Sequence, residues 1–380
     1  MSPASIHGFA FPTSIRFGPG ARKEVARHLE ASGHVRPLVV TDRGLAALPV
    51  FERFLGELTE LATATFSGVT GNPVRGQVVA GAAAYKAHGA DSVIGIGGGA
   101  ALDVAKAIAL MASHPGDILE YAWDHPQVRP INAPLPYFVA VPTTAGTGSE
   151  VGRSAVISDD ETHVKKIIFS PALLAKAVFA DPELTVDLPP AITAATGMDA
   201  LTHNVESYLS PAYHPLCDGI ALEGTRIAAG ALATAVREPG NLTARADMMI
   251  SSMMGAIAFQ KDLGAVHSCA HALGTVCDLH HGLANALMID TVLAWNAETV
   301  PGKFDELAHA AGVAGGGAAF VPWLRRLKET IGIAPRLGAA GVTREQVPRL
   351  VAIATADMCH QTNPRPCSAA DFERLFVAAL

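Results

Sequence analysis

Two stretches of the chain concentrate residue types that can bind a metal ion or move protons. The first, TGMDALTHNVESY at residues 196–208, places Asp199 and His203 four residues apart, so on a helix both side chains point the same way. The second, HSCAHALGTVCDLHHG at residues 267–282, holds four histidines among small and apolar residues, two of them again four apart. A hard carboxylate combined with several imidazoles suits a divalent ion such as Fe²⁺ or Zn²⁺.

The spacing leaves the identity of the ligands open. The candidates are Asp199, His203, His267, His271, His280 and His281. Any one of these histidines, taken alone, is better explained as a capped or surface imidazole than as a ligand. Because two pairs with four-residue spacing occur in apolar helical sequence and a further histidine follows, a metal site is the favoured interpretation.

A glycine-rich loop, GIGGGA at residues 95–100, fits the pattern G-x-G-x-x-[G/A] and lies between an expected strand and an expected helix. Glycines there allow the backbone to turn tightly and to approach a pyrophosphate, whose charge meets the amides at the helix N-terminus. The alternative is a plain strand-to-helix turn, since the chain has 36 glycines and the pattern alone is weak. The surrounding strand and helix favour phosphate binding.

Two further features support a dinucleotide. Asp42 ends the run LVVTD, where an acid can accept hydrogen bonds from an adenosine ribose and would repel a 2′-phosphate, so NAD is expected rather than NADP. Taken alone, Asp42 is better explained as a helix N-cap or turn residue. The loop PTTAGTGSE at residues 142–150 offers hydroxyls and amides to a phosphate or a nicotinamide, or is simply a tight polar loop.

Two different halves of the chain must position these residues. Four short apolar runs, expected to be strands, alternate with three helical patterns; the runs lie at residues 37–42, 91–99, 136–144 and 177–181, and the helical patterns at residues 21–32, 75–88 and 101–113. This alternation predicts a parallel sheet covered on both faces. From residue 190 the chain is rich in Ala, Leu and Met with a helical period. We therefore predict an α/β domain over residues 1–187 and an all-helical domain over residues 188–380.

The composition argues against several classes of protein. A formal net charge of −7, without a Lys/Arg-rich tract, argues against a nucleic-acid partner. The most apolar long window, residues 93–112, contains several glycines, Asp103 and Lys106, which argues against a membrane span. The N-terminus shows no secretory-signal pattern. Five cysteines, none in a CxxC pair, fit a reduced, cytoplasmic protein.

Taken together, the motifs resemble those of the iron-containing (group III) alcohol dehydrogenase family over nearly the whole chain. The similar segments are RFGPGA (16–21), GIGGGAALDVAKA (95–107), PTTAGTGSEV (142–151), DPELTVDLPP (181–190), TAATGMDALTH (193–203), HSCAHALG (267–274), HHGLANA (280–286) and TNPRP (362–366). The resemblance implies the architecture shared with dehydroquinate synthase, an α/β dinucleotide-binding domain with a parallel sheet followed by an all-α domain. It also implies a homodimer.

Carried over residue by residue, the resemblance assigns roles to the candidates. The metal, expected to be Fe²⁺ with Zn²⁺ as the alternative, would be held by Asp199, His203, His267 and His281. His271 would lie near the nicotinamide and take part in proton transfer, and His280 would be a bystander. The residues expected around the cofactor are Gly97, Gly98, Asp103, Thr143, Thr144, Thr147 and Lys165, with Lys166 as the alternative amine.

The implied activity is reversible hydride transfer between NAD(H) and a small primary alcohol or aldehyde. The alternative within dehydrogenases is a carboxylate-bearing substrate of the 4-hydroxybutyrate, succinate semialdehyde or maleylacetate type. Lys261 could pair with that carboxylate, or be a solvated helix lysine beside Asp262. A dehydroquinate synthase-type lyase is disfavoured because the acid here is Asp199, whereas that enzyme resembles a Glu/His/His site. A non-catalytic metal-binding protein is disfavoured because both the cofactor loops and the metal set are intact.

Overall fold

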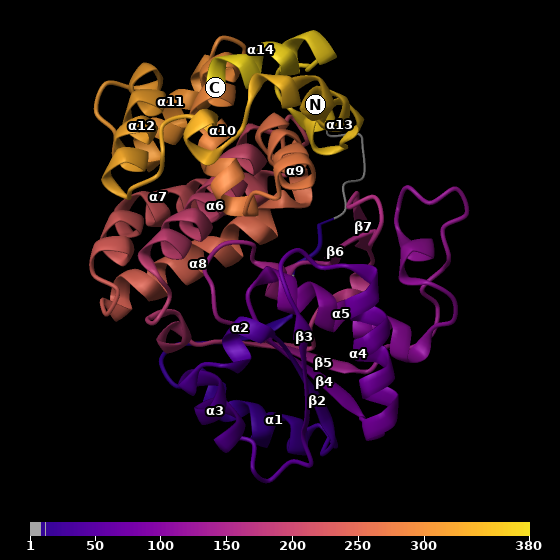
Figure 1. Ribbon diagram of the computed structural model, residues 1–380. Coiled ribbons are helices and arrows are strands. Elements are labelled where there is room, and N and C mark those ends of the chain that lie inside the picture. The colour runs from indigo at the N-terminus through magenta and orange to yellow at the C-terminus, as the bar shows by residue number, and fades with distance from the viewer. Residues whose placement is uncertain (1–8, 12) are drawn as a thin grey trace. The chain divides into compact units, whose positions relative to one another are not determined.

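The computed structural model describes residues 9–11 and 13–380 (Figure 1). Residues 1–8, part of the stretch judged to lack a secretory pattern, and residue 12 lie outside the described residues. The chain divides into two compact units. Among the described residues, an α/β unit contains residues 13–144 and 148–185, and a helical unit contains residues 9–11, 145–147 and 186–380. None of the described helices is long and apolar enough to span a membrane.

A six-stranded parallel sheet forms the centre of the α/β unit, in the order β1-β8-β5-β4-β2-β3. Its strands are β1 (Ser14–Phe17), β2 (Pro37–Asp42), β3 (Ala64–Val69), β4 (Ser92–Gly97), β5 (Tyr137–Pro142) and β8 (Ala177–Ala180). The predicted fold class is confirmed, and the four predicted apolar runs are the four inner strands. The two edge strands, β1 and β3, were not predicted, because their sequences are less apolar and more exposed.

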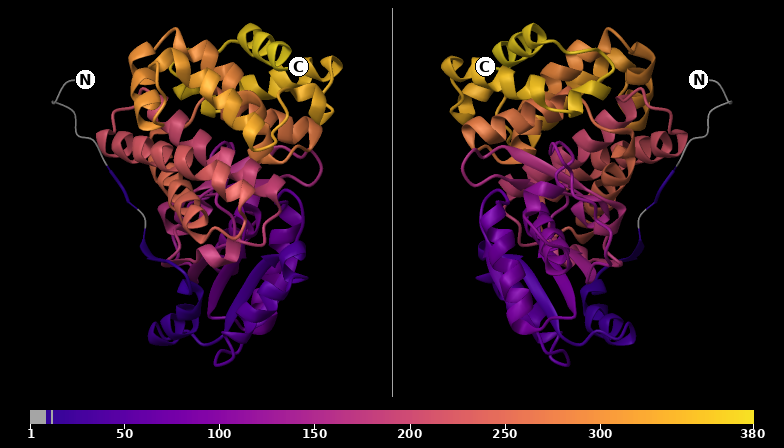
Figure 2. Two further views of the ribbon diagram at one scale, coloured as in Figure 1. Left: turned by 90° about the vertical axis from the view of Figure 1, so that its left-hand side faces the viewer. Right: turned by 90° about the vertical axis from the view of Figure 1, so that its right-hand side faces the viewer.

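Helices cover both faces of this sheet (Figures 1 and 2). On one face, α1 (Val25–Ala31) and α3 (Pro49–Gly56) contribute side chains such as Leu29 and Phe54 to a core with Ile94 and Val139 of the sheet. On the other face lie α4 (Arg75–His88) and α5 (Gly99–Ser113). Burial on both sides explains why β4 is buried throughout and has no polar residue after Ser92. A short helix, α2 (Arg43–Ala46), follows β2, and an antiparallel hairpin, β6 (Ser154–Ser158) and β7 (Lys165–Phe169), lies outside the sheet.

The helical unit is organised around α6, which is buried along almost its whole length. The helices are α6 (Pro190–Leu209), α7 (Pro215–Arg237), α8 (Leu242–Ala258), α9 (Ala265–Cys277), α10 (His281–Ala297), α11 (Pro301–Ala310), α12 (Phe320–Thr330), α13 (Val347–Ala356) and α14 (Ala369–Ala379). Helices α7, α8 and α10 pack against α6, and α9 packs against α10 and α13. Every residue of α6 from Thr193 to Leu209 is buried, so its acids and histidines lie inside the unit.

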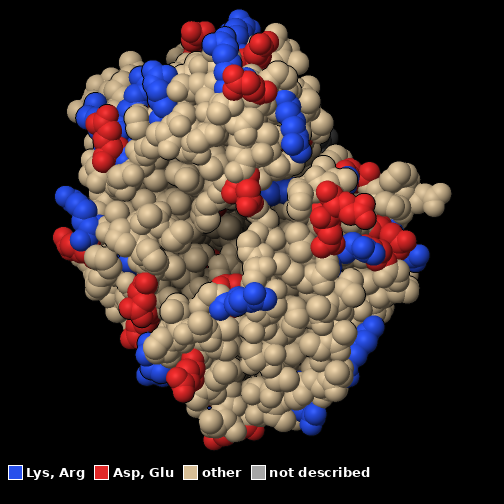
Figure 3. Space-filling model, viewed as in Figure 1, with Lys and Arg blue, Asp and Glu red and all other residues tan. Residues whose placement is uncertain are grey.

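Charged side chains of both signs are interspersed on the face of the molecule drawn in Figure 3. Among the described residues of that face, Lys and Arg form no broad continuous surface of the kind that nucleic-acid backbones require.

Candidate active site

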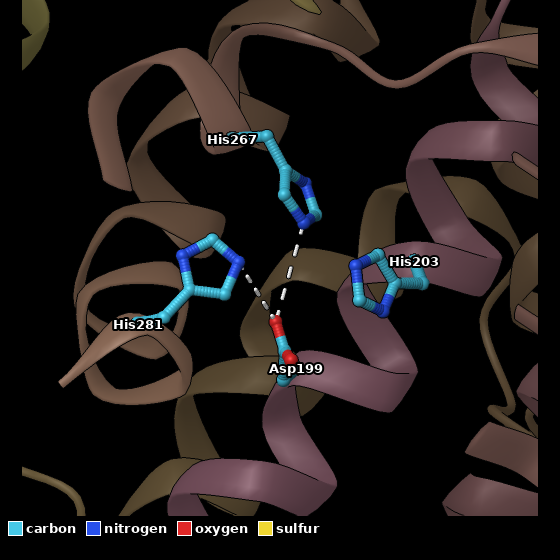
Figure 4. Close-up of side chains that lie close together, drawn as sticks. All are labelled: Asp199, His203, His267 and His281. Carbon is cyan, nitrogen blue, oxygen red and sulfur yellow. Dashed lines mark ion pairs between the residues drawn. The ribbon is translucent and has the colours of Figure 1, made fainter. Parts of the chain in front are cut away.

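Three helices of the helical unit bring four potential ligands together. Asp199 and His203 lie one turn apart on α6, His267 lies in the first turn of α9, and His281 begins α10. Each offers one ligand atom, and these atoms all lie within 4.8 Å of one another (Figure 4). Asp199 Oδ1 lies 3.5 Å from His281 Nε2 and 4.0 Å from His267 Nε2. The four-residue spacings in the sequence thus place their side chains on helix faces that converge.

The ring of His203 is held by the three-residue segment Ala145–Thr147, which belongs to the helical unit. Its Nδ1 donates a hydrogen bond to the carbonyl oxygen of Gly146, at 3.3 Å, which leaves Nε2 as the second ring nitrogen. Burial lowers the pKa of His203 to about 4, although Asp199 opposes the shift. A neutral imidazole at neutral pH is the form that binds metal. Gly146 is required in this place, since a Cβ there would lie 2.8 Å from Thr196 Cβ.

The ring of His267 is oriented by a carboxylate. Its Nδ1 lies 2.6 Å from Glu206 Oε2, and both side chains are about 1% exposed. Because Nδ1 carries the proton of this hydrogen bond, Nε2 keeps its lone pair on the side of Asp199.

The four side chains fit a divalent cation. Asn285 Nδ2 lies 2.7 Å from Asp199 Oδ1 and 3.3 Å from Nε2 of both His267 and His281. One amide group therefore faces a carboxylate and two imidazole nitrogens, while its own oxygen is buried without a hydrogen-bond partner among the described residues. The acceptor atoms of Asp199, His267 and His281 therefore outnumber the two hydrogens that the Asn285 amide can donate to them. Three nitrogens and one oxygen match the donor preferences of Fe²⁺ and Zn²⁺.

A second histidine–carboxylate pair lies beside this cluster. His271 Nδ1 lies 2.7 Å from Asp357 Oδ2, and the His271 ring stacks on the His281 ring with centroids 5.4 Å apart. Burial alone would raise the pKa of Asp357, but His271, Ser268 and the amide of Cys359 together lower it. Asp357 is therefore ionised at neutral pH and accepts a hydrogen bond from Nδ1 of His271, which leaves Nε2 as the second ring nitrogen.

Three polar residues of this site were missed in the sequence. Glu206 lies seven residues after Asp199 and three after His203, which is the same face of α6, and this spacing was available as a signal. Asn285 lies four residues after His281 on α10, a similar signal. Asp357 is 86 residues from His271, and no local pattern links the two.

The predicted cofactor loops lie at the carboxyl ends of three neighbouring parallel strands, β2, β4 and β5. The Thr143 amide donates to Gly97 O at 3.0 Å, and Gly98 lies against Thr144. Gly97 has φ +144°, and a Cβ there would lie 2.7 Å from Ala101 Cβ, so only glycine fits. This edge of a parallel sheet, followed by the N-terminus of α5, is where such folds bind dinucleotides.

Asp42 has two different neighbours at this edge. Its Oδ1 accepts a hydrogen bond from the Leu45 amide at 2.8 Å, so the carboxylate caps α2. Its Oδ2 lies on the side of Gly97, where an added Cβ would be 3.3 Å away. The residue is therefore an N-cap that also turns a charged oxygen toward the glycine loop.

Asp103 lies on α5, and its carboxylate accepts hydrogen bonds from other protein groups. Its Oδ1 accepts from Ser149 Oγ at 2.5 Å, and its Oδ2 accepts from the Val156 amide at 2.9 Å. Lys106 Nζ donates to the same serine and to Ser154 O. Asp103 thereby ties the end of the 142–150 loop and the β6–β7 hairpin to α5.

The remaining predicted cofactor residues are Thr147, in the 142–150 loop, and Lys165, in the β6–β7 hairpin. Thr147 belongs to the three-residue segment that groups with the helical unit. Lys165 begins β7 and pairs with Ser158 of β6, whereas the alternative amine, Lys166, donates to Asp124 at 2.6 Å.

Glu150 makes stability depend on pH. Burial raises its pKa to about 7, opposed by its own backbone amide and Lys106, and its Oε1 has no hydrogen-bond partner among the described residues. A carboxyl whose pKa is raised by folding costs stability as it ionises, from its unfolded pKa of about 4.5 up through 7. The full cost is on the order of 2–4 kcal/mol. We expect the melting temperature of Glu150→Gln, measured relative to that of the wild type, to increase by a few degrees as the pH rises from 5 to 8.5. A difference that is the same at both pH values would contradict this.

The surroundings of Lys261 differ from both expectations, a solvated helix lysine and a partner for a substrate carboxylate. The side chain is 1% exposed, and Nζ donates to Asp218 Oδ1 on α7. It is therefore not a solvated helix lysine, and its pairing with Asp218 argues against a role as the partner of a substrate carboxylate.

Comparison with known proteins gives matches along the whole chain. A family profile described as iron-containing alcohol dehydrogenase matches residues 12–182, and the profile of that family's C-terminal region matches residues 193–380. A 4-hydroxybutyrate dehydrogenase from Cupriavidus necator is 39% identical, over 97% of this chain and 98% of that protein. The crystal structure of a 1,3-propanediol oxidoreductase has a TM-score of 0.94 at 35% identity, covering 99% and 100% of the two chains. That of a sulfoacetaldehyde reductase from Bifidobacterium kashiwanohense, in complex with NAD⁺, has a TM-score of 0.89 at 28% identity and covers 99% of each chain.

Proposed function

The chain belongs to the iron-containing alcohol dehydrogenase family of NAD-linked oxidoreductases, and we propose that it interconverts small primary alcohols and aldehydes at the cluster of Asp199, His203, His267 and His281. The convergence of these four ligand atoms within 4.8 Å is the observation that carries the proposal. These four side chains would hold Fe²⁺, which when bound would supply Lewis-acid chemistry at the substrate oxygen. The buried protein groups around it exclude water and fix the ring orientations.

His271 provides the proton-transfer group in this proposal. Its Nδ1 is engaged by Asp357, so Nε2 takes the alcohol proton during oxidation and returns it during aldehyde reduction. The charge of Asp357 stabilises the imidazolium that forms. Since His271 stacks on His281, the proton-transfer group lies directly beside a proposed ligand.

Metal reconstitution tests the function. Protein stripped of metal is reloaded anaerobically with Fe²⁺ or Zn²⁺, and NADH oxidation is followed with propanal, butanal, lactaldehyde, glyoxylate and succinate semialdehyde. We expect metal-dependent turnover of the short aldehydes, with Fe²⁺ more active because it accepts a fifth ligand more readily than a closed tetrahedral Zn²⁺ site. Absence of turnover with either metal, under NADH and NADPH, would overturn the proposal.

A second candidate is a dehydrogenase of 4-hydroxybutyrate. The similarity to the Cupriavidus necator enzyme supports it, because the match is 39% identical over almost the full length of both chains. The pairing of Lys261 with Asp218 argues against Lys261 as the group that recognises the carboxylate. In the same assay, a kcat/KM for succinate semialdehyde about tenfold or more above that for butanal would select this candidate, since tenfold corresponds to about 1.4 kcal/mol.

Cofactor preference is tested at Asp42. We expect Asp42→Ser to keep the cap on α2, because serine is also a good N-cap, while removing the charge that faces the glycine loop. Loss of a charge-assisted hydrogen bond to the ribose, together with relief of repulsion toward a 2′-phosphate, should lower the NADH/NADPH ratio of kcat/KM by about 10- to 100-fold. Steady-state kinetics with both cofactors measure this ratio. An unchanged ratio would reduce Asp42 to a helix cap.

A further inference from the structure

Glu206 is a buried carboxylate whose ion-pairing partner is a histidine. The side chain lies on α6, and its residue is 2% exposed. Among the described residues, His267 is the basic group within ion-pair distance of it. A buried carboxylate without Lys or Arg beside it is costly unless other groups compensate its charge.

The compensation comes from the N-terminus of α9. Glu206 Oε1 accepts from the Val266 amide at 2.7 Å, and Oε2 accepts from the His267 amide at 3.2 Å as well as from the His267 ring. These amides belong to the first turn of α9, which is the positive end of the helix dipole and favours a nearby anion. Gly264 permits the approach, since a Cβ there would lie 2.6 Å from Glu206 Oε1.

We propose that Glu206 is a positioning residue that raises the affinity of the site for its metal ion by acting through His267. The inference rests on the proposed function, because it assumes that His267 Nε2 is a ligand. The carboxylate fixes the ring and its tautomer, so that Nε2 always meets the ion with its lone pair. Its negative charge, passed through the ring, also makes Nε2 a stronger donor. Glu206 thus contributes to metal affinity without touching the ion.

A purely structural role as the cap of α9 is the competing explanation, and Asn363 provides the matched control. Asn363 Oδ1 accepts from the Ala265 amide at 3.1 Å, at the same helix N-terminus. Asn363 forms no hydrogen bond with a histidine ring among the described contacts. Loss of Asn363 therefore weakens the same helix end and leaves the carboxylate–histidine pair in place.

The experiment compares the wild type with Glu206→Gln and Asn363→Ala. The Kd for Zn²⁺ is measured by chelator competition, and the visible spectrum of the Co²⁺-loaded protein reports the ligand geometry. Removal of such outer-sphere partners weakens metal affinity by about 10- to 100-fold, and we expect this increase in Kd for Glu206→Gln, with an altered Co²⁺ spectrum. Asn363→Ala should keep the wild-type Kd and spectrum.

Each outcome decides a separate point. A wild type that binds no Zn²⁺ would overturn the proposed function itself. A wild type that binds Zn²⁺ with Glu206→Gln equal to it, or with both variants weakened equally, would overturn only the role of Glu206. If Glu206→Gln does not fold, as shown by its circular dichroism, the comparison is made with Glu206→Asp, which keeps the charge but shortens its reach. An increase in Kd for that variant, again absent from Asn363→Ala, supports the proposal, and an unchanged Kd overturns it.

Discussion

Replacing His281 with alanine is expected to abolish metal retention and to lower kcat/KM by about a thousandfold or more, because a Lewis acid contributes several kcal/mol to such reactions. His281 is a suitable ligand to remove, since its side chain is 24% exposed and it lies at the start of α10. The buried pair of Glu206 and His267 remains intact in this variant. Metal content after dialysis and the rate of NADH oxidation measure the effect.

His280 is the matched control for this substitution. It immediately precedes His281, is exposed, and lies outside the group of four converging ligands. His280→Ala should therefore keep its metal and its activity. Equal loss of metal in both variants would show that the start of α10, rather than the imidazole of His281, determines the site.

The convergence of the four candidate ligands was predictable because their chemistry is local in sequence. Asp199 with His203 and His267 with His271 lie at helical spacings within apolar sequence, and those segments are the buried helices α6 and α9. Choosing His281 over His280 required the resemblance to a family, since spacing alone does not distinguish two adjacent histidines. The structure separates them independently, by placing the His281 ring within the cluster and leaving His280 exposed.

The groups that orient the histidines were harder to predict from the sequence. Glu206 stands in the same segment as Asp199 and His203, but a glutamate on a helix is usually a solvated residue. Its carboxylate is instead bonded to the amides at the N-terminus of α9, which no local pattern predicts. Asp357 comes from the end of α13, far along the chain. Lys261 shows the converse, because its sequence neighbours suggested solvent or substrate, whereas the fold places Asp218 beside it.

The fold was predictable where strands are buried on both faces. The four inner strands of the sheet are β2, β4, β5 and β8. Their burial is visible in the sequence as short apolar runs. β1 and β3 form the edges, where fewer neighbours demand apolar residues. The hairpin of β6 and β7 contains short runs of consecutive apolar residues, in SAVIS and KKIIF, but it lies outside the parallel sheet that the βα alternation predicts.

Replacing His271 with alanine is expected to lower kcat by about 10²- to 10⁴-fold while metal content stays at the wild-type level, because the residue moves a proton and is not one of the four ligands. Asp357→Asn should lower kcat by a smaller factor, about 10- to 100-fold, because the amide can still accept from Nδ1 but no longer stabilises the imidazolium with a charge. Since Asp357 acts through His271, the double variant should be no slower than His271→Ala alone. Multiplicative losses in the double variant would show that Asp357 acts independently, and loss of metal from His271→Ala would move that residue into the ligand set.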